Sequence, residues 1–314
     1  MAEDKNIVLG VDIGGSHITA AAVDLDRFEI IAGTSFNREI NNKASKEAII
    51  GAWADTVREV LKTCIQTVGL DRKKVAGIGI AMPGPFDYLN GVGMFEGNDK
   101  YESLYKVDVR EPLSQLVNIP EEKIHFFNDA TSFAVGAALQ QKVLHHRTVG
   151  LTLGTGFGAA FLMNGLPAAE HSQVPENGCL WDKSFKDGIA DDYFSTRWFV
   201  RQYEAMTGQA CKGVREIVAF NNAATHQVFE EFIENLTEFL APHLERFKAD
   251  VLMMGGNIAK AHPLFLEALK KSLGVPLGLQ MEIVNNTESC NILGASHLMS
   301  LDYWKQQTAL KAFI

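Results

Sequence analysis

An aspartate and a pair of glycines near the start of the chain have the types and the spacing needed to bind a phosphate group. The apolar run Ile7–Val11 ends in Asp12, Gly14 and Gly15 follow, and an apolar segment resumes at Ile18–Val23. Adjacent glycines allow a positive φ and let bare N–H groups approach an anion. A carboxylate at the strand end can hold a hydrated divalent cation beside that anion. The segment predicts a β-hairpin with a phosphate-binding turn, although an ordinary surface hairpin has the same pattern.

Two more glycine turns follow apolar runs later in the chain. The run Val149–Leu153 leads into Gly154–Gly158 and a returning apolar segment, so the first hairpin is repeated about 140 residues later. The run Val251–Met254 ends at Gly255 and Gly256. A single turn of this kind is weak evidence. Three of them, two in repeated hairpins, predict two phosphate-binding hairpins from facing domains and a glycine loop that contacts adenosine, and hence a nucleotide-binding protein.

Other nucleotide, metal and nucleophile motifs are absent from the sequence. There is no GxxxxGK(S/T) loop and no GxGxxG motif that follows a strand and opens a helix, so P-loop and dinucleotide-binding interpretations lose their main support. There is also no HExxH, GxSxG or CxxC motif. The four cysteines are far apart, which is typical of reduced thiols and predicts neither disulfides nor a zinc site: Cys64, Cys179, Cys211 and Cys290.

Composition limits the class of protein further. The 314 residues predict about two domains, each with its own core. A formal net charge of −9 argues against general binding to nucleic acid or to an anionic membrane. A small anionic substrate is compatible with this charge, because N–H groups and metal ions can offset it locally. The polar segment 1–5 does not resemble a signal peptide, and no apolar run is long enough to span a membrane, so we expect a cytoplasmic protein.

The elements that position these turns follow an alternating pattern. A third strand is expected over 29–36, after the opening hairpin. Helical spacing covers 43–68, and 75–81 and 124–127 are short apolar strands. A helix is expected at 130–141, with Asn128 or Asp129 as its N-cap. Beyond the second hairpin, 166–188 is a polar loop, 189–247 is helical, and a final helix starts near Ile292. Strands alternating with helices predict a mixed α/β fold.

Four blocks of this sequence, in this order, resemble the sugar-kinase/actin/chaperone ATPase fold: VLGVDIGGSHITAAAVD, FFNDATSFAVGAAL, LTLGTGFGAAF and LMMGGN. Within this fold they are most similar to the ROK family (repressor, open reading frame, kinase) of bacterial glucokinases and amino-sugar kinases. The resemblance implies two similar mixed-sheet domains of the ribonuclease H-like, actin-like ATPase type around a central cleft. We expect one domain at 1–127 plus about 297–314 and the other at 128–296.

The resemblance also implies roles for individual residues. Asn128 would hold a sugar hydroxyl, and Asp129 would take the proton from the attacking hydroxyl, although Asp129 could instead be only a helix cap. Asp12 would lie near a magnesium ion. The expected ATP contacts are Asp12, Gly14, Gly15, Ser16 and His17 in the first turn, Gly154, Thr155, Gly156 and Gly158 in the second, and Gly255, Gly256 and Asn257 in the third.

The chain departs from the family pattern where the sugar would bind. The usual Glu-x-Gly-His motif and CxCGxxGC zinc loop are absent, so no zinc is expected. If 178–181 takes the place of the first motif, Cys179 replaces its glutamate, and Asp191 takes the place of the glutamate after the zinc loop. The remaining candidates for sugar contacts are Asn98, Asp99, Glu170 and His171, all of which could equally be solvated loop residues. His17 stands where the family usually has lysine or arginine.

The leading hypothesis is an ATP-dependent kinase that transfers the γ-phosphoryl group to a hydroxyl of a hexose or an N-acyl amino sugar, with Mg²⁺. The alternative is a non-catalytic member that binds sugar or nucleotide and regulates a partner. A DNA-binding repressor is disfavoured, because the hairpin begins within the first ten residues and leaves no room for a helix-turn-helix before it. The expected partners are therefore small molecules, with a homodimer as an option by analogy.

Overall fold

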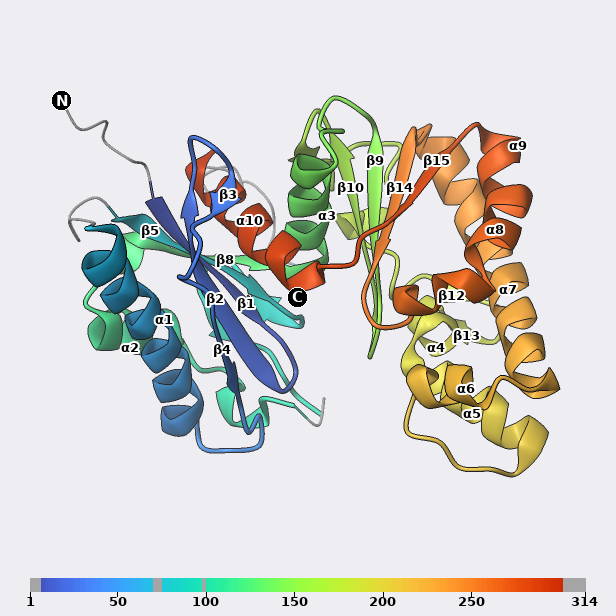
Figure 1. The fold of residues 1–314 in the computed structure, drawn as a ribbon, viewed down its shortest axis with the longest axis horizontal. Coiled ribbons are helices and arrows are strands. Elements are labelled where there is room, and N and C mark those ends of the chain that lie inside the picture. The colour runs from blue at the N-terminus through green and yellow to red at the C-terminus, as the bar shows by residue number, and fades with distance from the viewer. Residues whose placement is uncertain (1–6, 70–74, 98–99, 302–314) are drawn as a thin grey trace. The chain divides into compact units, whose positions relative to one another are not determined.

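The computed structural model describes residues 7–69, 75–97 and 100–301. The chain forms two compact units, the first within 1–139 and 288–314 and the second within 140–287 (Figure 1). The boundaries expected from the sequence were near 127 and 297. The first unit also includes residues 129–139 of the helix that follows residue 128 and residues 288–300 of the last helix.

The first unit is built on a six-stranded mixed sheet with the order β3-β2-β1-β5-β8, in which β4 also pairs with β2. Strands β1 and β2 form the predicted antiparallel hairpin, and β5 and β8 extend it in parallel. The strands of this sheet are β1 (Ile7–Ile13), β2 (His17–Asp24), β3 (Glu29–Ile30), β4 (Phe36–Glu39), β5 (Val75–Met82) and β8 (Ile124–Asn128). A separate two-stranded ribbon consists of β6 (Phe86–Asp87) and β7 (Val92–Gly93).

Helix α1 (Lys46–Val68) covers one face of this sheet, beside α2 (Arg110–Val117) (Figure 1). It begins after Ser45, whose side chain accepts a hydrogen bond from Ala48 N, and it ends at Gly69 in the left-handed conformation. Its buried positions share a core with alternate residues of the strands. This core includes Ile49, Trp53, Val57, Leu9, Val11, Ile78 and Ile80.

Helix α10 (Thr287–Ser300) packs on β1 and on α3 (Asp129–Gln140) at backbone distance. A Cβ atom on Gly10 would lie 2.6 Å from Ile292 O, and one on Gly294 would lie 1.9 Å from Ser132 O of α3. No side chain fits at either position, so the helix is fixed closely against the strand. Because side chains alternate along a strand, Asp12 lies on the same face of β1 as Gly10 and is directed towards α10.

The second unit repeats the sheet arrangement in a five-stranded mixed sheet with the order β11-β10-β9-β14-β15. Strands β9 and β10 form the second antiparallel hairpin, and β14 pairs in parallel with both β9 and β15. The predicted repeat of the hairpin is therefore confirmed. The strands are β9 (Thr148–Leu153), β10 (Phe157–Met163), β11 (Leu166–Pro167), β14 (Val251–Gly255) and β15 (Gln280–Ile283), with the small ribbon β12 (Ser184–Phe185) and β13 (Gly188–Ile189).

The helices of the second unit bury an aromatic core against this sheet. Phe194 lies 5.2 Å from Phe239, ring centroid to centroid, and 6.3 Å from Phe232, and all three are buried. Large rings bury the most apolar area per residue, which suits a core shared by several short helices. The helices are α4 (Ala190–Phe194), α5 (Thr196–Thr207), α6 (Val214–Phe220), α7 (Ala223–Phe247), α8 (Leu266–Leu269) and α9 (Val275–Leu277).

Two element boundaries differ from the sequence-based prediction. The single strand expected over 29–36 is two short strands, β3 and β4, separated by a turn that contains Gly33 with φ 77°. The last helix was expected to start near Ile292 but begins at Thr287, because its first turn is polar and shows no apolar periodicity. Within the described residues, no helix is long and apolar enough to cross a membrane.

Candidate functional site

Three hydrogen bonds to backbone carbonyl oxygens hold the turn of the first hairpin in place. Gly14 N donates to His17 O at 2.8 Å, and the Tyr101 hydroxyl donates to Gly14 O. The Asn42 amide donates to Gly15 O. These bonds occupy carbonyl oxygens, whereas no hydrogen bond within the described part of the chain uses the N–H groups of Gly15 and Ser16. The turn therefore has free donors for an anion.

The expected positive φ at Gly14 and Gly15 is wrong, because neither residue is in the left-handed region. Glycine leaves room there for two neighbouring side chains instead. A Cβ atom on Gly14 would lie 2.8 Å from the His17 ring, and one on Gly15 would lie 3.3 Å from Lys100 Nζ. The ammonium group of Lys100 thus lies beside the turn. No sequence motif marks this cation, which comes from a loop about 85 residues later.

Asp12 is a buried carboxylate among other carboxylates. It is 5% exposed, and Oδ1 accepts a hydrogen bond from Asn291 Nδ2 at 2.8 Å. Burial raises the pKa of Asp12 to about 8, the bond from Asn291 opposes this, and the charges of Asp129 and Glu288 raise it further. An ionised Asp12 is unfavourable at this buried position unless a cation neutralises it, and a hydrated Mg²⁺ held mainly through water and phosphate needs only one or two carboxylates from the protein.

The two side chains of the Asn-Asp pair, Asn128 and Asp129, make different hydrogen bonds at the start of α3. Asn128 Oδ1 accepts from Thr131 N at 3.1 Å and therefore caps α3. Its Nδ2 donates to the hydroxyl of Tyr88 at 3.0 Å, which fixes the amide. Asp129 Oδ1 accepts from the adjacent Ala130 N at 2.8 Å. The cap that the sequence left open between the two residues is thus made by Asn128.

The carboxyl group of Asp129 has the electrostatics of a base. Burial raises its pKa to about 6, while hydrogen bonds from the backbone N–H groups of Ala130 and Asp129 and the charge of Lys100 lower it. A carboxyl with this pKa is mostly ionised at neutral pH and still has appreciable proton affinity, which suits a group that accepts a proton.

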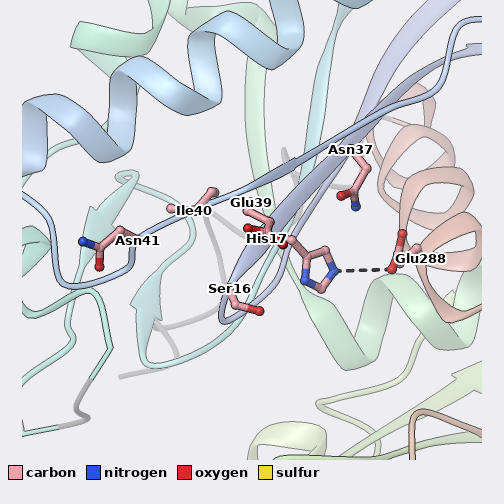
Figure 2. A pocket seen from close by; sticks show the side chains of 7 residues that line it. All are labelled: Ser16, His17, Asn37, Glu39, Ile40, Asn41 and Glu288. Atoms are coloured by element: carbon pink, nitrogen blue, oxygen red, sulfur yellow. Dashed lines mark ion pairs between the residues drawn. The ribbon is translucent and has the colours of Figure 1, made fainter.

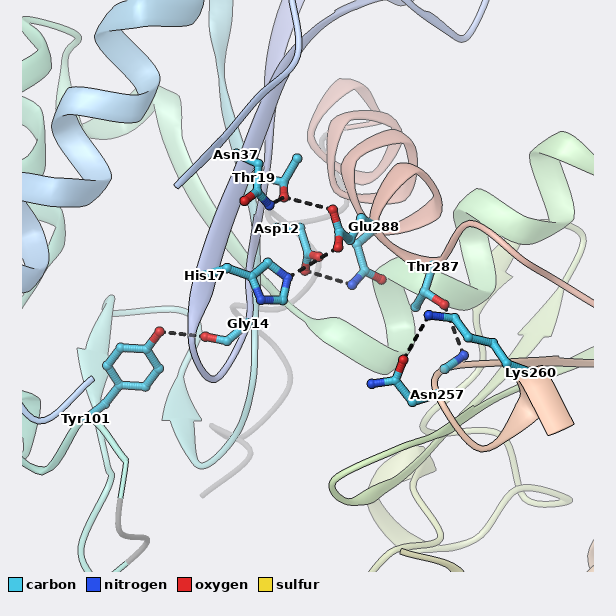
Figure 3. Close-up of polar contacts among 12 residues, drawn as sticks. Asp12, Gly14, His17, Thr19, Asn37, Tyr101, Asn257, Lys260, Thr287 and Glu288 are labelled. Atoms are coloured by element: carbon cyan, nitrogen blue, oxygen red, sulfur yellow. Dashed lines mark hydrogen bonds and ion pairs between the residues drawn. The ribbon is translucent and has the colours of Figure 1, made fainter. Parts of the chain in front are cut away.

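His17 is paired with a carboxylate from α10. Its Nε2 lies 3.4 Å from Glu288 Oε1, and the other oxygen of Glu288 accepts from Thr19 Oγ1 at 2.9 Å (Figure 3). Thr19 in turn accepts from Asn37 Nδ2 at 2.7 Å. His17 and Glu288 line a polar groove together with other residues of the hairpin and β4 (Figure 2), and its lining comprises Ser16, His17, Asn37, Glu39, Ile40, Asn41 and Glu288.

The turn of the second hairpin is held by the residues that follow Ile189. Thr196 N and Oγ1 both donate to Gly154 O at 2.8 Å. Asp191 Oδ1 accepts from Phe157 N at 2.7 Å, and its Oδ2 pairs with Arg197 Nη2 at 2.5 Å. Both oxygens of Asp191, a predicted sugar contact, are therefore engaged beside the second turn. The turn contacts of Thr196 and Arg197 were not predicted, and no sequence motif marks them.

The third turn follows β14 directly. Gly256 has φ 96° and donates from N to Thr287 Oγ1 at 3.0 Å. A Cβ atom on Gly256 would lie 2.4 Å from Leu153 O, so only glycine fits there. The side-chain oxygen of Asn257 accepts from Lys260 Nζ at 2.9 Å (Figure 3). A positive φ is thus required at this turn, unlike at the first.

The loop between β10 and β12 carries the remaining sugar candidates. Glu170 is exposed, and His171 Nδ1 accepts from Gln173 N at 3.2 Å. Asn98 and Asp99 lie outside the described residues. Basic side chains hold the loop, since Arg147 donates to Gln173 Oε1 and Arg246 to Ser172 O. Across the described residues, no group of three His, Cys, Asp or Glu side chains could hold a metal ion.

Cys179, expected to replace a family glutamate if 178–181 takes the place of the Glu-x-Gly-His motif, is half-buried in the same loop. Its Sγ lies 3.5 Å from Asp182 Oδ1. Burial raises the pKa of the Cys179 thiol to about 12, and the charge of Asp182 adds to this effect. The thiol stays protonated at neutral pH and cannot stand in for a carboxylate that accepts sugar hydroxyls.

The fold and the three glycine turns define a member of the ROK family. The model of that family matches residues 8–297, and the chain belongs to it. Among curated relatives, the chain is 24% identical over 292 residues to an N-acetyl-D-glucosamine kinase of Haemophilus influenzae, covering 84% of this chain and 88% of the relative. It is 28% identical over 293 residues to a glucokinase of Thermotoga maritima, covering 85% and 86% of the two chains.

Solved structures show the same fold. A ROK hexokinase from Thermus thermophilus superposes with a TM-score of 0.74 at 17% identity, over 95% of this chain and 99% of that one. A ROK glucokinase from Streptomyces griseus in complex with glucose and AMPPNP gives 0.70 at 19% identity, over 93% and 98%. A ROK transcriptional regulator also matches, with 0.70 at 15% identity over 95% and 81%. The mixed α/β fold expected from the sequence, that of the actin-like ATPases, is therefore confirmed.

Proposed function

We propose that this chain is an ATP-dependent sugar kinase that transfers the γ-phosphoryl group of ATP to a hydroxyl of a hexose or an N-acyl amino sugar. The observation that carries the proposal is Asp129, a carboxyl group with a pKa of about 6 that is not used to cap its helix. Family membership and the named activities of the glucokinase and N-acetylglucosamine kinase relatives support it.

In the proposed reaction, Asp129 accepts the proton of the attacking sugar hydroxyl. Phosphoryl transfer requires mainly positioning, charge neutralisation and a base within hydrogen-bond reach of the nucleophile. Asn128 is held by Thr131 and Tyr88, so its amide is suited to binding a neighbouring hydroxyl without rearranging. The identity of the sugar then depends on further contacts, for which Asp191, Glu170 and His171 remain candidates along with Asn98 and Asp99.

The ATP contacts are assigned to the three glycine turns, with the residues expected from the sequence. The free N–H groups of Gly15 and Ser16 and the cation of Lys100 support a phosphate contact at the first turn. Asp12 would hold Mg²⁺, because it is a buried carboxylate crowded by two others. A bound Mg²⁺ would neutralise phosphate charge as it develops. Magnesium and the assignment of these residues are parts of the proposal.

A second candidate is a regulatory member that binds sugar or nucleotide without phosphoryl transfer. The observation that favours it is Cys179, a protonated thiol in place of the family's sugar-binding glutamate. A matching ROK structure is named a transcriptional regulator, so the same fold can carry such a function. For this chain the kinase is better supported, because the proton-accepting Asp129 and the buried Asp12 have the environment that catalysis needs.

A substrate panel tests the kinase proposal. Release of ADP is measured with ATP and Mg²⁺ against glucose, mannose, fructose, N-acetylglucosamine and N-acetylmannosamine, each well above millimolar concentration. We expect turnover with at least one of these sugars. Calorimetry on the same panel identifies sugar or ATP binding. Binding without any turnover would refute the kinase and favour the regulatory candidate.

A further inference from the structure

Helix α10 contacts both strands of the first hairpin through side chains of its first two turns. Glu288 binds Thr19 and His17 of β2, and Asn291 binds Asp12 of β1. These contacts join residues that are 269 to 279 positions apart in sequence. The helix that provides them cannot shift along β1, because its backbone lies against Gly10 without an intervening side chain.

The amide of Asn291 is 6% exposed and only half satisfied. Its Nδ2 donates to Asp12 Oδ1 at 2.8 Å, which is the orientation that an ionised, cation-holding carboxylate requires because it can only accept. The other end, Oδ1, is buried and has no hydrogen-bond partner among the described residues. An unpaired buried carbonyl is unfavourable, so its retention beside the carboxyl group of Asp12 needs an explanation.

We propose that Asn291 is a positioning residue for the cation-binding carboxylate. Its Nδ2 fixes the orientation of Asp12, and its Oδ1 accepts a hydrogen bond from a water molecule of the hydrated divalent cation. This inference rests on the kinase function proposed above, and it adds a residue of α10 to the site. Ligating carboxylates generally need such outer partners, and losing one typically weakens metal binding about 10- to 100-fold.

Magnesium-linked nucleotide binding tests this role. The Kd of ADP is measured by calorimetry with excess Mg²⁺ and with EDTA, for the natural protein and for Asn291→Leu. Leucine has the same number of side-chain heavy atoms and the same branching at Cγ, without polar atoms. We expect the factor by which Mg²⁺ tightens ADP binding to shrink by about 10-fold or more in the variant. The Kd in EDTA should not change. A Mn²⁺ titration followed by electron paramagnetic resonance, with ADP present, should show the same loss.

Ser296→Ala is the matched control. Ser296 is also buried on α10, but its hydroxyl donates to Ile292 O and does not touch Asp12. In Ser296→Ala, Mg²⁺ should tighten ADP binding by the same factor as in the natural protein. If Asn291→Leu does not fold, Asn291→Ala is measured in the same way.

Two outcomes separate this inference from the kinase proposal. If Mg²⁺ tightens ADP binding by the same factor in a folded Asn291 variant as in the natural protein, the positioning role is overturned and the proposed kinase function is left intact. Failure of the natural protein to bind ADP under either condition would overturn the proposed function itself, and this inference with it.

Discussion

Replacing Asp129 with asparagine should separate chemistry from nucleotide binding. The substitution keeps the size of the side chain and leaves the helix cap intact, because Asn128 makes it. It removes the group that accepts the proton. Loss of a general base typically costs about 10²- to 10⁴-fold, so we expect kcat to fall by that factor while the Kd of ADP stays essentially unchanged.

The pH dependence of the natural protein gives the same prediction a second measurement. With a pKa of about 6, Asp129 is about 0.9 ionised at pH 7 and about 0.1 ionised at pH 5. The base works only when ionised, so kcat/KM for the sugar should fall about tenfold between these pH values and level off above pH 7. The assay contains saturating Mg²⁺, because a cation bound at Asp12 would favour the ionised form of that carboxyl group. The acidic limb should be absent in Asp129→Asn.

The assay is ADP release with the sugar identified by the panel. Asp26→Asn is the control, because Asp26 is an exposed carboxylate just beyond the end of β2 that is opposite to the glycine turn. The control should keep both the rate and the acidic limb. Equal kcat in Asp129→Asn and the natural protein would remove Asp129 from the base role. An acidic limb that persists in Asp129→Asn would assign the titration to another group.

Two further predictions concern α10. Burial lowers the pKa of His297 to about 4 from the ordinary 6.5, so the unfolded chain binds more protons below pH 6.5 and stability is lost as pH falls from there towards 4. The free energy of unfolding is measured with urea at pH 7 and at pH 5. Its decrease between these pH values should be about 2 kcal/mol smaller in His297→Phe than in the natural protein, and an equal decrease in both proteins would refute this role of His297. Gly294→Ala should destabilise the protein by about 3 kcal/mol, because the added Cβ would meet Ser132 O. The control Gly51→Ala, in open space on α1, should stabilise it by about 0.5–1 kcal/mol. Similar shifts of the melting temperature in the two variants would contradict the packing argument.

The glycine turns and their strands could be predicted because both signals are local. An apolar run followed by glycine reports strand and turn within about ten residues, and the hairpin's repetition supported the interpretation. The reason for glycine at each turn could not be predicted. Gly256 needs its positive φ, whereas Gly14 has no positive φ and leaves space that the His17 ring occupies. Sequence alone does not distinguish a conformational from a steric requirement.

The sequence also could not show which of Asn128 and Asp129 caps α3. Both residue types are good N-caps, and either could start α3. The choice follows from Tyr88, which binds the Asn128 amide from a turn about 40 residues earlier. The same limit applies to Asp191, whose neighbours suggest a solvated loop. Its role at Phe157 N depends on a fold in which α4 follows a loop back to the second turn.

Helix α10 did contain a signal in its composition. Every residue from Cys290 to Met299 is buried, so each polar side chain in that stretch must find a partner or stay uncharged. Ser296 uses the carbonyl of its own helix, and His297 stays neutral over most of the accessible pH range. Asn291 has neither solution, because an amide has both a donor and an acceptor to satisfy. A helix buried on all sides therefore predicts that its asparagine faces a polar site, and in this chain that site is the carboxylate of Asp12.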